Sequence, residues 1–348
     1  MKILIRATNW VGDAIMTLPA LRAVRGRFPE AEIAILAHPY VADIYREQQI
    51  CNQLIGYDSQ AKHAGILGRE RLAAGLRAQK FDVALLLQNA FDAAWLAWRA
   101  GVPERIGYAR DGRSFLLTRA ISVPKAGEVP PHEKFYYLEL IRRAGWIDSL
   151  PDETFIALNV SEGNRRPAAE FLVQSGARPD SLRIAIGAGA SYGSAKCWPP
   201  SRFAELANRL QSQTEADVIL FGTAAEAAVT RAILSELRKP PIDLTEKTAI
   251  ADLPALLSQC HIFIGNDSGA MHVAAAVGLP VVAVFGPTDP YGTAPATPRC
   301  TIVQEKPYCN PCFLRHCPTD HRCMRAITPD MVEAAAKPWL HAVEAQRA

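Results

Sequence analysis

The sequence predicts an α/β protein made of two doubly wound domains. Short apolar runs of strand length alternate with amphipathic helices, and this alternation occurs twice along the chain. A segment rich in Gly, Asp, Ser and Pro at residues 145–154 separates the two runs. Strands that alternate with helices form parallel sheets covered on both faces. We therefore expect one domain over residues 1–150, a second over residues 151–348, and a cleft between them.

The composition agrees with this class and excludes several others. The chain has 348 residues, and 38 Lys and Arg against 35 Asp and Glu give a net charge of +3. Hydrophobic residues make up 49% and charged residues 21%, as in ordinary globular proteins. Disorder, coiled coil and collagen are excluded, and the small net charge argues against a nucleic-acid partner. The apolar run after Met1 is too short for a secretory signal.

Apolar spacing places the individual elements. In the first half it predicts strands at residues 2–6, 32–37 and 81–87, and helices at 13–28, 91–100 and 132–144. In the second half it predicts strands at 183–187, 217–221, 262–265 and 281–285, and helices at 201–213, 224–237, 268–277 and 329–343.

One stretch, residues 268–288, contains no charged residue and has the length of a membrane-spanning helix. Gly278, Pro280, Gly286 and Pro287 interrupt it, so it is better explained as a buried helix, a turn and a buried strand. The protein is then cytosolic or peripheral to a membrane.

Ligands of parallel sheets bind where strands end, so the loops that follow the strands are the places to look for chemistry. The first loop carries Asn9, Gly12 and Asp13 and has no GxGxxG pattern, which disfavours a dinucleotide oxidoreductase. Asp13 falls in the first turn of a helix, where the dipole stabilises a carboxylate. It therefore suits either a helix cap or a general base.

Two loops of the second half have the features of an anion site. Residues 187–199 are rich in small residues and contain Lys196, which suits a phosphate group or an ordinary solvated loop. Asn266, Asp267, Ser268 and Gly269 open a helix whose free amides can hold an anion, and His272 follows within one turn. In a third loop, Glu226 either favours the helix dipole or accepts hydrogen bonds from a ribose diol.

Four segments in this order resemble the ADP-heptose:lipopolysaccharide heptosyltransferases of glycosyltransferase family 9, most closely heptosyltransferase II. They are WVGDAIMTLPALRAVRGRFP, GAGASYGSAKCWPPSRFAELA, FGTAAE and GNDSGAMHVAAAVGLPVVAVFGPTDP. The resemblance implies the GT-B fold, in which two Rossmann-like domains face each other across a cleft. It also implies transfer of L-glycero-D-manno-heptose from ADP-heptose to the heptosyl-Kdo2-lipid A inner core of lipopolysaccharide.

The resemblance also implies roles for the candidate residues. Asp13 matches the catalytic base, Lys196 the lysine at the donor diphosphate and Glu226 the acidic residue near the ribose. Asn266, Asp267, Ser268, Gly269 and His272 match the donor-binding block. The N-terminal domain holds the acceptor, and Asn9, Arg110 and Arg113 are candidate contacts. The two arginines are chosen because they follow a strand and sit beside glycines, although the basic stretch around them also fits an ordinary solvated surface.

The chemistry implies a single displacement with inversion at the anomeric carbon. Lys196 and a helix N-terminus can stabilise the departing diphosphate, so catalysis requires no cofactor or metal. The acceptor is anchored in lipid, and the expected location is the cytoplasmic face of the inner membrane, with transient contact to its surface.

Four cysteines form a separate cluster: Cys309, Cys312, Cys317 and Cys323. In a reducing cytosol this spacing favours a structural Zn²⁺ or an iron–sulfur cluster, and free thiols or disulfides are the alternatives. The cluster is not expected to be catalytic, and it can clip the loop before the C-terminal helix.

Other functions remain open on the sequence alone. Heptosyltransferase I differs from II in its acceptor, which the sequence does not fix. A nucleotide-sugar 2-epimerase of GT-B shape needs no separate acceptor. A nucleotide-binding or metal-binding sensory module, built around the cysteines, would not depend on Asp13.

Overall fold

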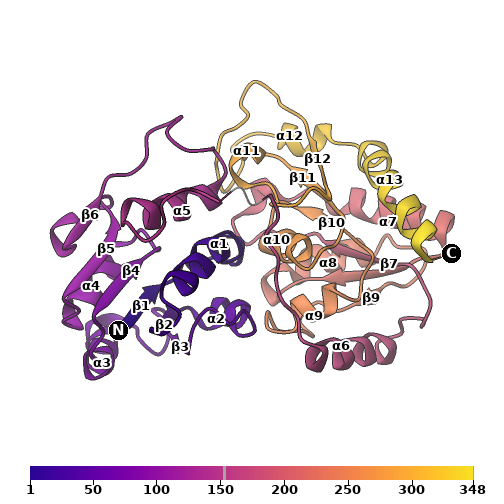
Figure 1. Cartoon of the computed structure of the whole chain (residues 1–348). Helices are drawn as coiled ribbons and strands as arrows, with labels where there is room; N and C mark the ends of the chain where they lie inside the picture. Colours follow the sequence, from indigo (N-terminus) through magenta and orange to yellow (C-terminus); the bar gives the residue numbers. More distant parts are fainter. Residues whose placement is uncertain (152–153, 348) are drawn as a thin grey trace. The chain divides into compact units, whose positions relative to one another are not determined.

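The protein consists of two compact units, Met1–Glu153 and Thr154–Ala348 (Figure 1). The computed structural model describes residues 1–151 and 154–347 of the chain. The boundary predicted at residue 150 falls shortly before the division between the units.

In the described residues of the first unit, six parallel strands form one sheet. They are β1 (Lys2–Arg6), β2 (Glu32–Ala37), β3 (Gln53–Gly56), β4 (Val83–Leu86), β5 (Glu104–Tyr108) and β6 (Arg119–Ile121), in the spatial order β3-β2-β1-β4-β5-β6. The helices are α1 (Val11–Arg27), α2 (Pro39–Tyr45), α3 (Gly65–Ala78), α4 (Phe91–Arg99), α5 (Glu133–Arg143) and the short 3-10 turn η1 (Ser114–Leu116). The strand order reverses between β1 and β4, and ligands of such sheets bind at that switch point.

The second unit repeats this topology, again with six parallel strands among its described residues. They are β7 (Arg183–Gly187), β8 (Asp217–Phe221), β9 (Ile242–Asp243), β10 (Ile262–Asn266), β11 (Val281–Phe285) and β12 (Cys300–Gln304), in the order β12-β11-β10-β7-β8-β9. Its switch point lies between β7 and β10.

Helices and short 3-10 turns connect these strands. They are α6 (Glu162–Gln174), η2 (Ser194–Lys196), α7 (Pro200–Thr214), η3 (Ala224–Glu226), α8 (Ala227–Leu234), α9 (Leu253–Leu257), α10 (Gly269–Ala276), α11 (Pro290–Thr293), α12 (Arg322–Ala326) and α13 (Pro329–Arg347).

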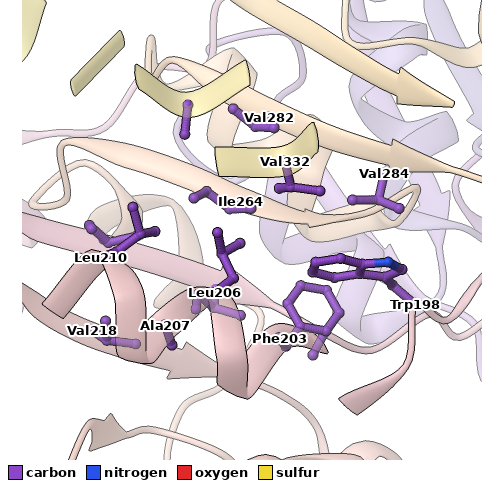
Figure 2. Packing of buried hydrophobic residues seen from close by; sticks show 14 of the residues in the cluster. Trp198, Phe203, Leu206, Ala207, Leu210, Val218, Ile264, Val282, Val284 and Val332 are labelled. Atoms are coloured by element: carbon purple, nitrogen blue, oxygen red, sulfur yellow. The ribbon is translucent and has the colours of Figure 1, made fainter. Parts of the chain in front are cut away.

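The central strands are continuous apolar runs because helices cover both faces of each sheet. Every residue of β7, β10 and β11 is buried. Figure 2 shows α7 contributing Phe203, Leu206 and Leu210 to the core, close to side chains of β10 and β11. Trp198 lies just before this helix and is fully buried. Its ring is edge-on to Phe203, and its indole N–H donates to the Ile327 carbonyl at 3.0 Å.

Strands with long apolar runs match the predictions, and most of the strands that were not predicted are short or partly exposed. β1, β2, β7, β8 and β11 have the predicted bounds. β3, β6 and β12 contain exposed or half-buried residues, and β9 has two residues, so they lack an apolar run. The predicted helix at 224–237 begins as η3 and ends at Leu234.

The charge-free stretch at residues 268–288 contains α10 and β11, as expected. Across the residues that the structure describes, none of the helices combines the length and the apolar character needed to cross a membrane.

Replacing Trp198 with Ala should lower the free energy of unfolding by about 3–5 kcal/mol, because it opens a cavity and leaves the Ile327 carbonyl without this donor. Trp98, which is 46% exposed, provides the matched control. Trp98→Ala should change stability by about 0.5 kcal/mol or less. Urea unfolding followed by circular dichroism measures both, and similar midpoints for the two variants would contradict the packing described here.

Candidate active site

At the switch point of the second unit, the buried side chain of Asn266 fastens the loop that follows β7. Asn266 ends β10, and its amide nitrogen donates to the Ala188 carbonyl at 2.6 Å. Its amide oxygen accepts from the Trp198 N–H at 3.0 Å. Both ends of the amide are therefore bonded to the backbone of that loop. The sequence analysis predicted that Asn266 contacts the sugar-nucleotide donor. In the structure its side chain positions the neighbouring loop.

An ion pair between Lys196 and Asp267 joins three loops. The Lys196 Nζ lies 2.5 Å from Asp267 Oδ2, and both side chains are nearly buried. The same carboxylate oxygen accepts from the Thr288 hydroxyl at 2.6 Å. Lys196 Nζ also lies 4.8 Å from the centre of the Tyr192 ring. The loops after β7, β10 and β11 thus meet at this ion pair.

Sequence analysis missed Thr288 and Tyr192. Thr288 follows the end of β11, so its place after a strand was the available signal. Tyr192 had no signal beyond its position in the loop that contains Lys196.

The N-terminus of α10 lies beside this ion pair in the sequence and is not capped by a side chain. Ser268 occupies the N-cap position without making a side-chain cap hydrogen bond. Its hydroxyl oxygen is buried, and it finds no hydrogen-bond partner among the described residues. Gly269 begins the helix, and His272 lies buried within the first turn. A helix start of this kind favours an anion through its backbone N–H groups.

The Glu226 carboxylate is bonded to Thr223, the N-cap residue of η3, whereas the sequence left open a role at the helix dipole or at a ribose. This carboxylate accepts from the Thr223 N–H at 2.8 Å and from the Thr223 hydroxyl at 2.9 Å. The two residues form a capping box. A Cβ atom at Gly189 would clash with the Glu226 carboxylate, so the loops after β7 and β8 touch here.

In the first unit, Asp13 and Asn9 lie near the carboxyl end of β1. Asp13 is partly exposed in the first turn of α1, and it interacts electrostatically with the buried phenols Tyr45 and Tyr137. The Asn9 side-chain oxygen accepts from the Arg6 guanidinium at 2.8 Å. Burial lowers the pKa of Arg6 to about 10. A buried cation thus fixes the loop that leads to Asp13.

Arg113, a candidate acceptor contact, is completely buried. Its guanidinium donates to the carbonyls of Gln88 and Tyr108 and to the Asn89 side-chain oxygen, the last at 2.8 Å. Desolvation lowers the pKa of this guanidinium to about 10. A Cβ at Gly107 would lie 3.2 Å from Arg113 Nη2, so the guanidinium packs closely against that glycine. Arg113 therefore fixes the loop after β4 through its bonds to Gln88 and Asn89.

Arg110 is exposed, and it is linked through Tyr136 to Asn89, the residue that Arg113 also contacts. Its guanidinium donates to the Tyr136 hydroxyl at 3.3 Å and pairs with Asp111 at 3.3 Å. The Asn89 amide donates to the same Tyr136 hydroxyl at 2.8 Å. Arg110, Asn89 and Tyr136 thus form one polar group at this edge of the first sheet.

In the part of the chain that the structure describes, all eight cysteines are free thiols. Hydrogen bonds from Thr319, together with one from the His321 amide, lower the pKa of Cys317. Burial raises the pKa of Cys323, and the thiols of Cys309, Cys312 and Cys317 raise it further. Among the described positions, no three His, Cys, Asp or Glu side chains already surround a point where a metal ion fits.

A family model described as glycosyltransferase family 9 (heptosyltransferase) matches residues 69–322. The chain belongs to this family. Over 312 residues it is 30% identical to lipopolysaccharide heptosyltransferase 2 of Escherichia coli K12, covering 87% of this chain and 88% of that protein. It is 28% identical over 334 residues to lipooligosaccharide heptosyltransferase 2 of Haemophilus influenzae, with the same coverage of 87% and 88%.

Solved structures agree with this family. Heptosyltransferase II of Escherichia coli matches with a TM-score of 0.83 and 28% identity, covering 99% of this chain and 100% of that one. A family 9 glycosyltransferase from Veillonella parvula matches with a TM-score of 0.86 at 22% identity, covering 98% and 97%, and supports the fold. The predicted fold class, two Rossmann-like units of the GT-B type, is confirmed.

The chain is accordingly a glycosyltransferase enzyme, and its relatives support heptose transfer in the biosynthesis of the lipopolysaccharide or lipooligosaccharide inner core. That activity implies a nucleotide-sugar donor and a lipopolysaccharide acceptor.

Replacing Asp267 with Ala should lower the free energy of unfolding by about 3 kcal/mol, because it leaves Lys196 buried beside no countercharge. Asp330→Ala is the matched control, since Asp330 pairs with Arg209 on an exposed surface. The control should cost less than about 1 kcal/mol. Thermal unfolding without ligand compares them, and equal losses would show that the Lys196–Asp267 pair contributes no more than a surface pair.

Proposed function

We propose that this heptosyltransferase moves L-glycero-D-manno-heptose from ADP-heptose to the heptosyl-Kdo2-lipid A inner core, with inversion at the anomeric carbon. The observation that carries the donor assignment is the buried Lys196–Asp267 pair, which directly precedes the uncapped start of α10. Family membership supports heptose as the transferred sugar.

The donor diphosphate binds to the Lys196 ammonium and the backbone N–H groups that follow Ser268. These groups are fixed before the donor arrives, so they stabilise the charge that develops on the departing ADP with little rearrangement. In this proposal Asp267 balances Lys196 in the free enzyme and accepts hydrogen bonds from sugar hydroxyls in the complex. Gly269 and His272 line the same pocket, and the Glu226 carboxylate accepts from the ribose.

No metal or other cofactor takes part in the chemical step that we propose. A cationic side chain and a helix N-terminus supply the positive charge that a metal ion supplies in other phosphate sites. This statement applies to the chemical step and not to a structural metal elsewhere in the chain.

Asp13 removes the proton from the acceptor hydroxyl as that oxygen attacks the anomeric carbon. A carboxylate near the end of a strand, partly exposed and with its preceding loop fixed by Arg6, suits a general base. One displacement with no covalent intermediate inverts the configuration. Asp13 belongs to the first unit and the donor residues belong to the second. A change at Asp13 should therefore affect heptose transfer without affecting ADP binding.

The acceptor is an anionic saccharide, and Arg110 is the exposed cation that we propose for it. Asn89, Tyr136 and Asn9 supply neutral hydrogen-bonding groups at the same edge of the first sheet. Arg113 positions Asn89 without touching the acceptor.

Because the acceptor is anchored in lipid, we propose that the enzyme works as a peripheral protein at the cytoplasmic face of the inner membrane. Contact with the membrane surface is then transient, and the enzyme has no nucleic-acid partner.

Replacing Asp13 with Asn should reduce heptose transfer by about 100-fold or more and leave the Kd for ADP unchanged, because it removes only the base. Transfer from ADP-heptose to heptosyl-Kdo2-lipid A is followed by mass spectrometry, and ADP binding by calorimetry. Asp43→Asn is the matched control and should transfer normally, since the half-buried Asp43 carboxylate of α2 pairs with the exposed Arg46. An Asp13→Asn variant with near-normal transfer would remove Asp13 as the base.

A further inference from the structure

The carboxyl edge of the first sheet exposes a row of large apolar side chains. Each of the strands β1 to β5 leads into a helix or a 3-10 turn, and an exposed apolar residue stands at the start of each of these elements. In chain order these residues are Trp10, Tyr40, Ile66, Leu67, Phe91 and Phe115. They are six of the eight exposed large apolar residues that the structure describes in the first unit. Single exposed apolar residues are ordinary, whereas a row along one edge indicates a binding surface.

Four of these residues lie around the starts of α3, α4 and η1, and we call them the apolar patch: Ile66, Leu67, Phe91 and Phe115. The rings of Phe91 and Phe115 lie 6.2 Å apart. Helices α3 and α4 pack side by side (Figure 1). Asp92 joins them, because one of its carboxylate oxygens accepts from the Tyr57 hydroxyl and the other lies 3.2 Å from Arg69 Nε. These contacts fix the arrangement of the patch.

The core of the first unit does not require the apolar patch. Other residues of the same elements, among them Leu72 of α3, Leu96 of α4 and Leu116 of η1, fill the core against the sheet. In the described chain Ile66 is 72% exposed and Phe115 is 76% exposed. Keeping this apolar surface in water is unfavourable. The patch is therefore suited to a partner that offers an apolar environment.

Positive charge lies beside the apolar patch. Lys62 and Arg71 are exposed, and they stand on either side of the two patch residues of α3 in the sequence. Glu70, the acidic residue between them, lies 2.6 Å from the guanidinium of Arg99. An anionic bilayer matches this combination, because apolar side chains enter the boundary of the acyl chains while cations stay among the headgroups.

The apolar patch is continuous with the groups that we assign to the acceptor. Phe91 follows Asn89 by two residues, and Phe115 belongs to the turn that follows Arg110. Arg113 connects the two segments, since its guanidinium donates to the Asn89 side-chain oxygen at 2.8 Å. The family activity implies a lipopolysaccharide acceptor, whose sugars are attached to lipid. The edge of the sheet that meets those sugars therefore also approaches the lipid surface.

We propose that the apolar patch enters the interfacial region of an anionic phospholipid bilayer, with Lys62 and Arg71 against the phosphate-bearing headgroups. Contact at this edge brings the acceptor groups of the first unit close to the membrane surface. The bilayer contact itself stands on the exposed residues, and only its benefit to heptose transfer rests on the proposed function.

The first experiment measures flotation with vesicles of phosphatidylethanolamine and phosphatidylglycerol that contain no acceptor. The wild type should bind, and Ile66→Ser/Leu67→Ser should lower the partition coefficient by about tenfold or more. Phe115→Ser, in a different element, should lower it by about threefold or more. Trp98→Ser is the matched control, since Trp98 is 46% exposed but lies in the last turn of α4, and it should bind normally. A wild type that does not bind, or a double variant that binds normally, overturns the proposal.

The contribution of the two cations is measured with the same assay. Lys62→Gln/Arg71→Gln should weaken binding by about fivefold or more, and added salt should weaken wild-type binding. Vesicles of neutral phosphatidylcholine should also bind the wild type more weakly. Equal binding to neutral and anionic vesicles overturns the role of Lys62 and Arg71.

Two further outcomes would assign the apolar patch to another occupant. Binding only to vesicles that contain heptosyl-Kdo2-lipid A would show that the patch contacts the acceptor lipid and not the bilayer. A wild-type dimer in analytical ultracentrifugation that Ile66→Ser/Leu67→Ser converts to a monomer would show that a second copy of the chain covers the patch. Either result overturns the proposal, and a monomer that binds acceptor-free vesicles supports it.

The final experiment separates this proposal from the proposed function. Ile66→Ser/Leu67→Ser should transfer heptose normally to a deacylated acceptor in solution, and about tenfold more slowly to the acceptor embedded in vesicles. If the wild type binds vesicles through the patch but transfers no heptose, the proposed function is wrong and the bilayer contact stands. If the double variant transfers heptose to the embedded acceptor at the wild-type rate, the bilayer contact is wrong and the proposed function stands.

Discussion

The Lys196 ammonium and the Asp267 carboxylate lie 2.5 Å apart near the carboxyl edge of the second sheet, and the loops after three strands are arranged around them. Burying either charge without the other would be energetically costly, because burial removes the water that would solvate it. Thr288 adds a third loop through its hydrogen bond to Asp267, and Tyr192 covers the ammonium with its ring. The pair therefore both shapes the site and supplies the cation that we assign to the donor diphosphate.

The first unit has the same topology as the second, so it also has a switch point where loops meet. Both sheets reverse their strand order between the first and fourth strand of the unit. At each switch point a buried polar side chain bonds the backbone of a neighbouring loop. Asn266 does this in the second unit, and Arg113 does it near β4 in the first. In each unit, a buried polar side chain thus holds a loop that contains residues we assign to the chemistry.

The sequence could predict the parts of the fold that depend on local pattern. Continuous apolar runs identified β1, β7 and β11, and loops after strands identified the candidate residues. Edge strands such as β3 and β9 could not be found, because their stability comes from pairing with a neighbour and not from their own apolar residues. The alternation of strands and helices predicted two doubly wound domains, and the family resemblance added the GT-B assignment and the transferase activity, which composition and spacing alone did not specify.

Contacts between distant residues could not be predicted in the same way. Nothing local links Lys196 to Asp267 or Asp92 to Tyr57. Arg113 was expected to contact the acceptor because it follows a strand beside a glycine, and this pattern does not distinguish an exposed cation from a buried one. Glu226 fitted two roles equally on the sequence, and its hydrogen bonds to Thr223 were not among the contacts that the pattern predicted.

The central claim is that the Lys196 ammonium binds the donor diphosphate, and ADP titration calorimetry tests it most directly. Lys196→Met should raise the Kd for ADP by about 10- to 100-fold, which corresponds to about 1.4–2.8 kcal/mol. Lys247→Met, which changes an exposed lysine of the same unit bonded to the Asp243 carbonyl, should leave the Kd unchanged. A folded Lys196→Met protein that binds ADP as tightly as the wild type would contradict the account.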